Sequence, residues 1–590
     1  MSDFVIKKSS NKAGTGDRRL QIAALCIAGI AGIIMVRLFF LMVVNHSFYE
    51  QLAAGAHDLY AQLFPKRGSV FIQDTRTKET FPLAMNRDVF LLYADTRNIT
   101  TDDEAEKIAE TLAPLLGYDD EKKFALFTAI NKRTDPYEPI EPQIEESVKQ
   151  QIEEKQLPGI QFVRQSKRFY PEGPLAASVI GFLGKNEEGK DIGRYGIEGY
   201  WNDTLAGVQG YVAGLRGAGG SVITSAGRVF EPAQHGSDVL LTLDRTLQYR
   251  ACEILRERMT EYGADSASLI MMNPHSGAII AMCSLPDFDP NIYSQVDDAA
   301  VYNNASIFTP YEPGSIMKPL VMAAAINEEL VTPNSVFFDS GFKEGLCQKP
   351  IRNANNKSYG DQTMTGVLEN SINTGMIYIA ELLGKQREIA YLERFGLGVK
   401  EGIELDKESS GTLESLSLNS GDKIDCYAAT ASFGQGITAT PLQMVTAFSA
   451  IANGGLLMKP YIVEEIRHSD GRVEKIKPTQ IRRVISERAA GLVGAMMVSV
   501  IEKGQTKSAV IPGYHVAGKT GTAQIAEKGI YVDATNHSFV GFVPVEDPAF
   551  VMIVTFEKPD RGFADSTSGP TFQKIASFAL QYYGIAPRGQ

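Results

Sequence analysis

The sequence has few of the residues that form metal, redox and nucleic-acid sites. Its seven histidines show no HExxH or comparable ligand spacing, so we expect neither a metal site nor a cofactor. Its five cysteines are widely spaced and odd in number, and they form neither a CxxC motif nor a recognisable disulfide framework. The net charge of -12 excludes the excess of lysine and arginine that nucleic-acid binding requires.

Internal repeats, low-complexity segments and proline-rich linkers are also absent, so domain boundaries follow from changes in residue pattern. At 590 residues, 44% of them hydrophobic and 22% charged, the chain predicts two or three folded units. Residues 45–235 are mixed and charged, with helical periods at 104–116 and 142–154, and they contain no catalytic motif. We expect this stretch to form a separate, non-catalytic domain.

One long apolar run, residues 20–44, is sufficient to cross a bilayer core of about 30 Å. Lysines and arginines precede it, and after Arg37 within the run the next one is Lys66. The positive-inside rule therefore places a short tail, residues 1–19, in the cytoplasm and the remainder outside a cytoplasmic (inner) membrane, in the periplasm or extracytoplasmic space. The alternative is a cleaved signal peptide ending at the A-x-A segment 54–56, although its apolar region is usually shorter.

Arg37 interrupts the outer part of this predicted span. It either snorkels to the membrane surface or contacts a polar group on another membrane protein.

The pattern of the chain changes after residue 235. A strand is predicted at 238–243 and a helix at 247–262, followed by a strand hairpin at 266–284 that turns at 273–277. A second strand pair, 537–543 with 550–556, and a helix at 572–583 come near the end. Strands at both ends of a long helical middle predict an α+β domain, residues 236–590, in which one sheet collects both ends.

The first motif with chemical content is Ser315-Ile316-Met317-Lys318, which precedes an apolar helical run at 320–326. A lysine three residues after a serine lies on the same helical face and can reach its hydroxyl. Burial beside other cations would lower the lysine pKa, so that the amine can take the serine proton. Taken singly, Ser315 would be a helix cap and Lys318 a surface charge.

Two further motifs follow, Ser371-Ile372-Asn373 and Lys519-Thr520-Gly521-Thr522. The third motif is the only K-T-G in the chain, and it follows a segment with the pattern of a strand entry. Its glycine lets a ligand lie against the strand, while the lysine and threonines offer a charge and hydroxyls to a carboxylate. The shorter motifs also occur by chance, at 9–12 and 417–419, so order and spacing carry the inference.

The three motifs together resemble those of penicillin-binding proteins and serine β-lactamases. From about Arg67 the chain resembles the class B, monofunctional penicillin-binding proteins. Their pedestal signatures are matched by Arg67-Gly68, Arg168-Phe169-Tyr170-Pro171, residues 176–184, Gly196-Ile197-Glu198-Gly199 and Leu205-Ala206-Gly207. The chain departs from the family's R-G-x-I-x-D-R-N-G turn, because no glycine follows Asp74 over residues 75–80.

The resemblance implies an α+β fold with an N-terminal transmembrane helix, an elongated dimerisation-like pedestal and a transpeptidase domain built from an antiparallel sheet and helices. It also implies a D,D-transpeptidase that cross-links peptidoglycan through a serine acyl-enzyme. The implied catalytic roles are Ser315 as nucleophile, Lys318 as base, Ser371 as proton relay and Lys519 as a charge in the network. Asn373 would hold the substrate amide, and Thr520, Gly521 and Thr522 would bind the substrate carboxylate. The N–H groups of Ser315 and Thr522 would form the oxyanion hole.

Within the family, residues 312–319, 431–436 and 440–443 are most similar to the septal, cell-division type, and the elongation type is the alternative. The layout excludes a bifunctional class A protein. A D,D-carboxypeptidase, a β-lactamase and a β-lactam sensor stay open because they share the motifs. The implied partners are stem peptides ending in D-Ala-D-Ala, β-lactams, a polytopic membrane glycosyltransferase and other cell-division proteins.

Overall fold

The computed structural model describes residues 58–63, 65–215, 229–527 and 530–588. They divide into two compact units. The smaller unit contains a three-stranded antiparallel sheet in the order β1-β8-β9, formed by Asp58–Leu63, Gly210–Leu215 and Val229–Glu231. The predicted tail (1–19) and span (20–44), including Arg37, lie outside the described residues, and none of the described helices combines the length and apolar character of a membrane span.

The larger unit contains a seven-stranded sheet with the path β19-β18-β10-β2-β3-β4, in which β5 also pairs with β3. Its β10 pairs in parallel with β2 and antiparallel with β18, so strands far apart in the sequence share one sheet. The strands are β2 (Val70–Gln73), β3 (Thr80–Ala94), β4 (Glu138–Ile144), β5 (Ile160–Phe169), β10 (Asp238–Asp244), β18 (Val463–Arg467) and β19 (Val473–Lys475).

Three helices pack on one part of this sheet around a small core that includes Leu92, Ile108 and Leu112. They are α3 (Asp102–Leu116), α4 (Asp120–Ile130) and α5 (Glu146–Glu153). The predicted helix at 142–154 is wrong in its first residues: the segment up to Ile144 is strand β4, because it pairs with β3. Tertiary pairing here overrides the local helical period.

The turn between β2 and β3 closes without the family's glycine. Asp74 accepts hydrogen bonds from the backbone N–H groups of Arg76 (3.0 Å) and Thr77 (2.9 Å). Lys78 then takes the left-handed conformation, with φ of 63°, that a glycine would adopt at lower cost. The departure in sequence is therefore accommodated by a strained lysine and a carboxylate that caps the turn.

The pedestal signature residues come together in a buried ion cluster. Glu198, with a fully buried side chain, accepts hydrogen bonds from Arg168 Nε (2.6 Å) and Arg67 Nε (2.8 Å). Arg168 also donates to the carbonyl oxygen of Gly68 (2.7 Å). The cluster thus connects the start of the chain's larger unit to β5 and to helix α7 (Gly196–Tyr200). The remaining short elements of this region are α6 (Ala177–Ile180), β6 (Phe182–Lys185), β7 (Asp191–Arg194) and α8 (Asn202–Ala206).

A five-stranded antiparallel sheet, in the order β12-β11-β23-β22-β21, organises the region after β10. Its strands are β11 (Ser266–Met272), β12 (Ile279–Leu285), β21 (Ala517–Glu527), β22 (Ile530–Val543) and β23 (Phe550–Glu557). Both predicted strand pairs are confirmed, and one sheet does collect the two ends of the region. The predicted flanking helices are present as α9 (Arg245–Tyr262) and α18 (Ser568–Tyr583).

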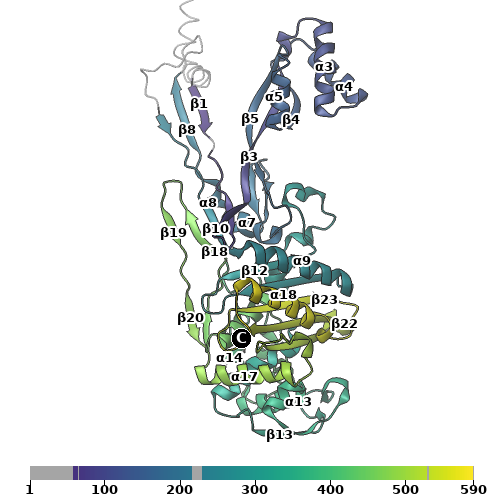
Figure 1. The fold of residues 1–590 in the computed structure, drawn as a ribbon, viewed down its shortest axis with the longest axis vertical. Helices are drawn as coiled ribbons and strands as arrows, with labels where there is room; N and C mark the ends of the chain where they lie inside the picture. Colours follow the sequence, from purple (N-terminus) through teal and green to yellow (C-terminus); the bar gives the residue numbers. More distant parts are fainter. Residues whose placement is uncertain (1–57, 64, 216–228, 528–529, 589–590) are drawn as a thin grey trace, which may run out of the picture. The chain divides into compact units, whose positions relative to one another are not determined.

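Each face of this sheet is buried in a separate hydrophobic core. Along β23, Val551 and Ile553 contribute to one core while Met552 and Val554 contribute to the other. Burial on both faces explains why the strand is a nearly continuous apolar run rather than an alternating one. Helices α9 and α18 cover one face, as Figure 1 shows, and the cluster on that side includes Phe572.

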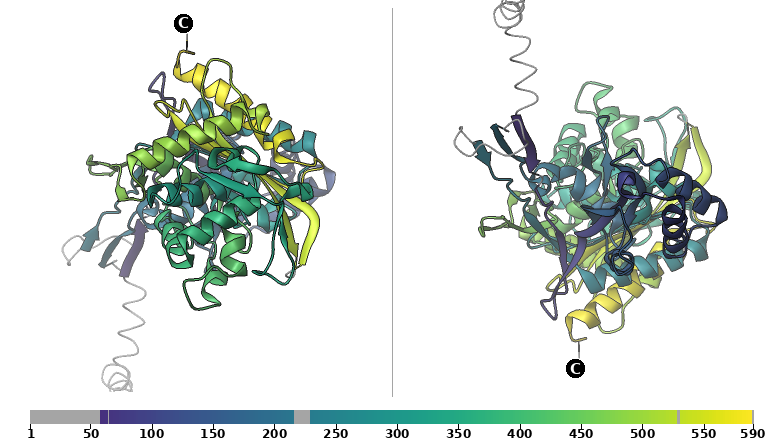
Figure 2. Two further views of the ribbon diagram at one scale, coloured as in Figure 1. Left: turned by 90° about the horizontal axis from the view of Figure 1, so that it is seen from below. Right: turned by 90° about the horizontal axis from the view of Figure 1, so that it is seen from above.

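The helices between the two strand groups gather on the other side of the sheet, where the view from below shows them in teal and green (Figure 2). They are α10 (Ala305–Phe308), α11 (Lys318–Asn327), α12 (Met364–Glu369), α13 (Asn373–Leu383), α14 (Lys385–Arg394), α15 (Cys426–Ala431), α16 (Pro441–Ala452) and α17 (Glu487–Glu502). Short paired strands connect them: β13 (Val336–Asp339) with β16 (Gly360–Thr363), β14 (Phe342–Lys343) with β15 (Ile351–Arg352), and β17 (Leu456–Met458) with β20 (Gln480–Arg483).

Two disulfides are formed, although the cysteine spacing indicated no framework. Cys252 on α9 is bonded to Cys283 on β12, and Cys347, after β14, is bonded to Cys426 at the start of α15. The partners are 31 and 79 residues apart, and only the packing of their elements brings them together. The fifth cysteine, Cys26, lies outside the described residues.

The Glu198 cluster generates a stability prediction. Glu198→Gln leaves two buried guanidinium groups without a carboxylate, so we expect the free energy of unfolding to fall by about 3–5 kcal/mol. Asp88→Asn is the matched control, because its pair with Arg164 is exposed and such pairs contribute about 0–1 kcal/mol. Urea unfolding followed by circular dichroism measures both, and equal losses in the two variants would contradict the prediction.

Candidate active site

Ser315 lies in a 3-10 turn, Gly314–Met317, that continues directly into α11. Pro319 falls in the first turn of that helix, where a missing N–H does least harm. The turn packs closely against a second chain segment, because Gly314 N–H donates to the carbonyl oxygen of Gly434 (3.0 Å). A Cβ on Gly434 would lie 2.2 Å from the Gly314 oxygen, so a glycine is required there and the nucleophile turn is held in place.

Lys318 is buried completely, in a helix whose residues are buried from Lys318 to Ile326. Its Nζ donates to the Ser371 carbonyl oxygen (2.7 Å), Ser371 Oγ (3.1 Å) and Asn373 Oδ1 (2.8 Å). All three acceptors are uncharged. Burial, and then the positive charge of Lys519, hold the pKa of Lys318 well below its usual range, so the amine can act as a base.

Ser371 links this amine to the nucleophile. Its Oγ accepts from Lys318 and donates to Ser315 Oγ across 3.1 Å. The sequence predicted direct reach from Lys318 to Ser315, whereas the hydrogen bonds run through Ser371. Since a hydroxyl rotates to donate in either direction, this chain can move a proton between Ser315 and the amine. Ser371 has a φ of 52°, a strained conformation for a residue with a side chain.

The third motif lies on β21, the edge strand of the five-stranded sheet. Lys519 is 2% exposed and donates to the Thr520 carbonyl oxygen (3.1 Å). Burial lowers the pKa of Lys519 to about 8. Thr522 Oγ1 accepts from the N–H of Ala564 (3.1 Å), and Thr520 Oγ1 lies 3.3 Å from Thr506 Oγ1.

Gly521 has a packing role that the sequence did not indicate. A Cβ at this position would lie 2.6 Å from Ser538 Oγ on the neighbouring strand and 2.8 Å from the carbonyl oxygen of Pro313. The absence of a side chain therefore lets β21 approach the nucleophile turn. The sequence argument considered only the approach of a ligand.

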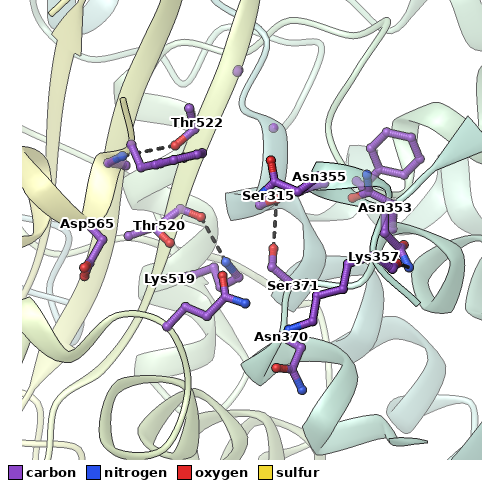
Figure 3. Close-up of a pocket in the computed structure, with 18 of the residues that line it drawn as sticks. Ser315, Asn353, Asn355, Lys357, Asn370, Ser371, Lys519, Thr520, Thr522 and Asp565 are labelled. Carbon is purple, nitrogen blue, oxygen red and sulfur yellow. Dashed lines mark hydrogen bonds between the residues drawn. The ribbon is translucent and has the colours of Figure 1, made fainter. Parts of the chain in front are cut away.

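The three motifs line one cavity of about 580 Å³. Figure 3 shows Ser315 and Ser371 between a wall that carries Lys519, Thr520 and Thr522 and a wall that carries Asn353, Asn355 and Lys357. Sequence reasoning gave no site role to several lining residues: Asn353, Asn355, Lys357, Tyr359, Phe433, Gln435, Gln505, Phe563 and Asp565. Phe433 and Gln435 lie in the segment 431–436 that carries the family resemblance, and no local motif marks the others. In the described parts of the chain, no group of three or more His, Cys, Asp or Glu side chains gathers as metal ligands would.

This arrangement is that of an active-serine acyltransferase: a hydroxyl nucleophile, a buried amine connected to it, and a second lysine on the opposite strand beside hydroxyl groups. Comparison with known proteins agrees. Residues 267–577 match the penicillin binding protein transpeptidase domain, and residues 63–241 match the penicillin-binding protein dimerisation domain. The chain therefore belongs to the penicillin-binding protein transpeptidase family, in its class B branch.

Three relatives illustrate the similarity. Stage V sporulation protein D of Bacillus subtilis is 32% identical over 553 residues, which cover 91% of this chain and 82% of the relative. The peptidoglycan D,D-transpeptidase FtsI homolog of Mesostigma viride is 27% identical, with 97% of each chain covered. The crystal structure of penicillin binding protein 3 from Mycobacterium tuberculosis, complexed with aztreonam, aligns with a TM-score of 0.67 at 26% identity and covers 90% of this chain and 98% of that one.

Replacing the buried amine tests its role. We expect Lys318→Ala to slow acylation of Ser315 by penicillin about 100- to 10,000-fold, because removal of a general base typically has that effect. Stopped-flow or gel-based acylation rates measure it. Lys385→Ala, at a buried lysine that pairs with Asp425 outside the cavity, is the matched control for loss of a buried amine. An unchanged rate in Lys318→Ala would assign the base to another group.

The lowered pKa of Lys519 generates a pH prediction. We expect its protonated form to attract the carboxylate of the substrate, so the second-order rate constant of acylation should fall as pH rises through about 8 and the charge is lost. Lys519→Arg keeps its charge in this range and should abolish that fall, whatever its absolute rate. An identical alkaline limb in both proteins would show that another group titrates.

Proposed function

We propose that this protein is a peptidoglycan D,D-transpeptidase of the septal type, which cross-links stem peptides through an acyl-enzyme at Ser315 and is inhibited by β-lactams. The observation that carries the proposal is the hydrogen-bonded chain from Lys318 through Ser371 to Ser315, facing Lys519 across one cavity. The relatives support the same activity, since several are named peptidoglycan D,D-transpeptidases.

In the proposed reaction, Ser315 Oγ attacks the carbonyl carbon between the two terminal D-alanines and its proton passes to Lys318 through Ser371. The N–H groups of Ser315 and Thr522 receive the oxyanion. Protonation of the leaving nitrogen by the same chain releases D-alanine and leaves an ester on Ser315. An amine of a neighbouring stem peptide then attacks the ester carbonyl carbon and loses a proton to Lys318. The amide bond forms as the ester bond to Ser315 breaks, and the proton returns through Ser371 to Ser315 Oγ.

The substrate side of the proposal rests on the charges and amides of the two walls. Lys519, with the hydroxyls of Thr520 and Thr522, would hold the terminal carboxylate beside Gly521. Asn373 begins α13, and its Nδ2 donates to the Arg352 carbonyl oxygen (3.0 Å) while Oδ1 accepts from Lys318. This fixed amide would hold the substrate backbone. A β-lactam would occupy the same positions and leave a slow acyl-enzyme.

We further propose four segments with distinct roles: a cytoplasmic tail (1–19), a single membrane-spanning helix (20–44), a non-catalytic pedestal (45–235) and the transpeptidase domain (236–590). In this arrangement the catalytic domain lies outside the cytoplasmic membrane. The two disulfides support that location, because disulfides persist in oxidising compartments. A polytopic membrane glycosyltransferase would supply glycan strands and, with other cell-division proteins, contact the membrane span and the pedestal.

Substitution of the nucleophile tests the function. We expect Ser315→Ala to abolish labelling by fluorescent penicillin, because Ser315 carries the hydroxyl that Ser371 connects to the buried amine, and Ser371 itself acts as the relay. Intact-mass mapping of the wild-type adduct should place the label on Ser315. Ser415→Ala, at a serine outside the cavity, is the control.

A second assay, with peptide substrates, distinguishes a transpeptidase from a carboxypeptidase and from a β-lactam sensor. With a D-Ala-D-Ala peptide and an amine acceptor, a transpeptidase forms the cross-linked amide, whereas a carboxypeptidase releases only the hydrolysed peptide. A β-lactam sensor would be acylated stably and release no D-alanine. Labelling of Ser315→Ala at another serine would overturn the proposed mechanism.

A further inference from the structure

One lysine in the cavity belongs to none of the three motifs. Lys357 lines the wall opposite Lys519, and its side chain points into the cavity from the side that carries Asn353 (Figure 3). Its ammonium lies 4.6 Å from the centroid of the Tyr359 ring, and within the described parts of the chain no ion pair joins it to a carboxylate. Asp565 also lines the cavity, but it accepts a hydrogen bond from Ser508 (2.6 Å).

Hydrogen bonds to a buried carboxylate fix the loop that carries Lys357. The buried Asp339 accepts from Asn353 Nδ2 (2.9 Å) and from the Tyr359 N–H (2.8 Å), and Asn353 Nδ2 also donates to the Lys357 carbonyl oxygen (3.1 Å). The same carboxylate accepts from Thr374 Oγ1 (2.6 Å), next to Asn373. The backbone of Lys357 is thus held by a buried network that also contacts the start of the second motif's helix.

Two residues of this loop are strained. Asn355 and Asn356 have φ values of 57° and 54°, in the left-handed region. Consecutive left-handed residues cost free energy, and such strain persists where the surrounding structure fixes it, often beside ligands. Here it lies directly before Lys357 and turns the chain along the cavity wall. Lys357 is itself exposed, so the network and the strained residues fix its backbone and leave its ammonium accessible.

We propose that Lys357 forms a subsite for a carboxylate of the donor stem peptide, upstream of its terminal D-alanines. This inference rests on the proposed function: Lys519 and the threonines take the terminal carboxylate, so a cation on the opposite wall is available to a second anion. A stem peptide offers two sources, the free α-carboxylate of a γ-linked D-glutamate and the side-chain carboxylate of a dicarboxylic diamino acid at the third position. Lys357 therefore determines specificity and is not a catalytic residue.

Four synthetic pentapeptides ending in D-Ala-D-Ala test the subsite: one with both carboxylates, two with either one amidated, and one with both amidated. The readout is the inhibition constant of each peptide against labelling of the full-length protein in detergent by fluorescent penicillin, followed by D-alanine release. We expect wild type to bind the preferred carboxylate peptide about tenfold more tightly than its amidated form, the effect of one charge-assisted hydrogen bond. The carboxylate whose amidation weakens binding is the one that Lys357 recognises.

Three variants isolate the charge. Lys357→Ala should bind the carboxylate peptide and its amidated form about equally, and Lys357→Arg should retain the preference for the carboxylate peptide. Lys349→Ala removes an exposed lysine from the same disulfide-closed segment, outside the cavity, and should leave the preference unchanged. A preference that persists in Lys357→Ala, or its absence in wild type, would overturn the subsite. If no peptide competes and Ser315 is not labelled, the proposed function itself fails, which is a distinguishable result.

Discussion

The burial of Lys318 without a carboxylate partner is the constraint on which the site depends. An unpaired ammonium inside a protein costs several kcal/mol, so burial holds the pKa of Lys318 well below its usual range and favours the neutral amine. Helix α11 is buried on all sides from Lys318 to Ile326, which denies the side chain a route to solvent. Ser371 and Asn373 accept the hydrogen bonds of the Lys318 amine, and the nearby positive charge of Lys519 further opposes its protonation. Desolvation of Lys318 thus provides a base for the hydroxyl of Ser315, which is a poor nucleophile on its own.

The position of Lys519 depends in turn on the five-stranded sheet. Its neighbouring strands β22 and β23 are buried on both faces, so a slip in register would move large side chains such as Phe539 and Phe542 into the wrong core. β21 pairs with β22 along a long ladder and forms the outer edge. The register fixed by the cores therefore sets which residues of the edge strand face Ser315.

The parts of this architecture that sequence could predict are those with local signals. These signals are the apolar runs of β11, β12 and β23, the turn at 273–277 and the three motifs. Each can be predicted because it depends on a few adjacent residues. Strand β4 was misread because its pairing with β3, and not its own period, determines its structure.

What sequence could not predict depends on residues far apart along the chain. The two disulfides and the network from Asp339 to Lys357 each join segments that only the fold brings together. The relay role of Ser371 came from the family resemblance, and its hydrogen bonds to Lys318 and Ser315 also depend on the fold. No local pattern encodes such contacts. The buried state of Lys318 belongs to the same group, because a lysine beside a helix start is usually a surface charge.

Backbone conformation also constrains the geometry of the site. Gly314 approaches Gly434 so closely that a side chain on the latter would collide, Gly521 leaves room for Pro313, and Ser371 occupies a left-handed conformation that costs of order 1–3 kcal/mol. These contacts fix the nucleophile turn, the edge strand and the relay relative to one another. Acyl transfer requires the reacting atoms to be held close and aligned, and geometry fixed in advance avoids the entropy of ordering them in the transition state. The two hydrophobic cores that enclose the sheet stabilise this strained arrangement, so the packing of apolar side chains far from Ser315 contributes to its reactivity.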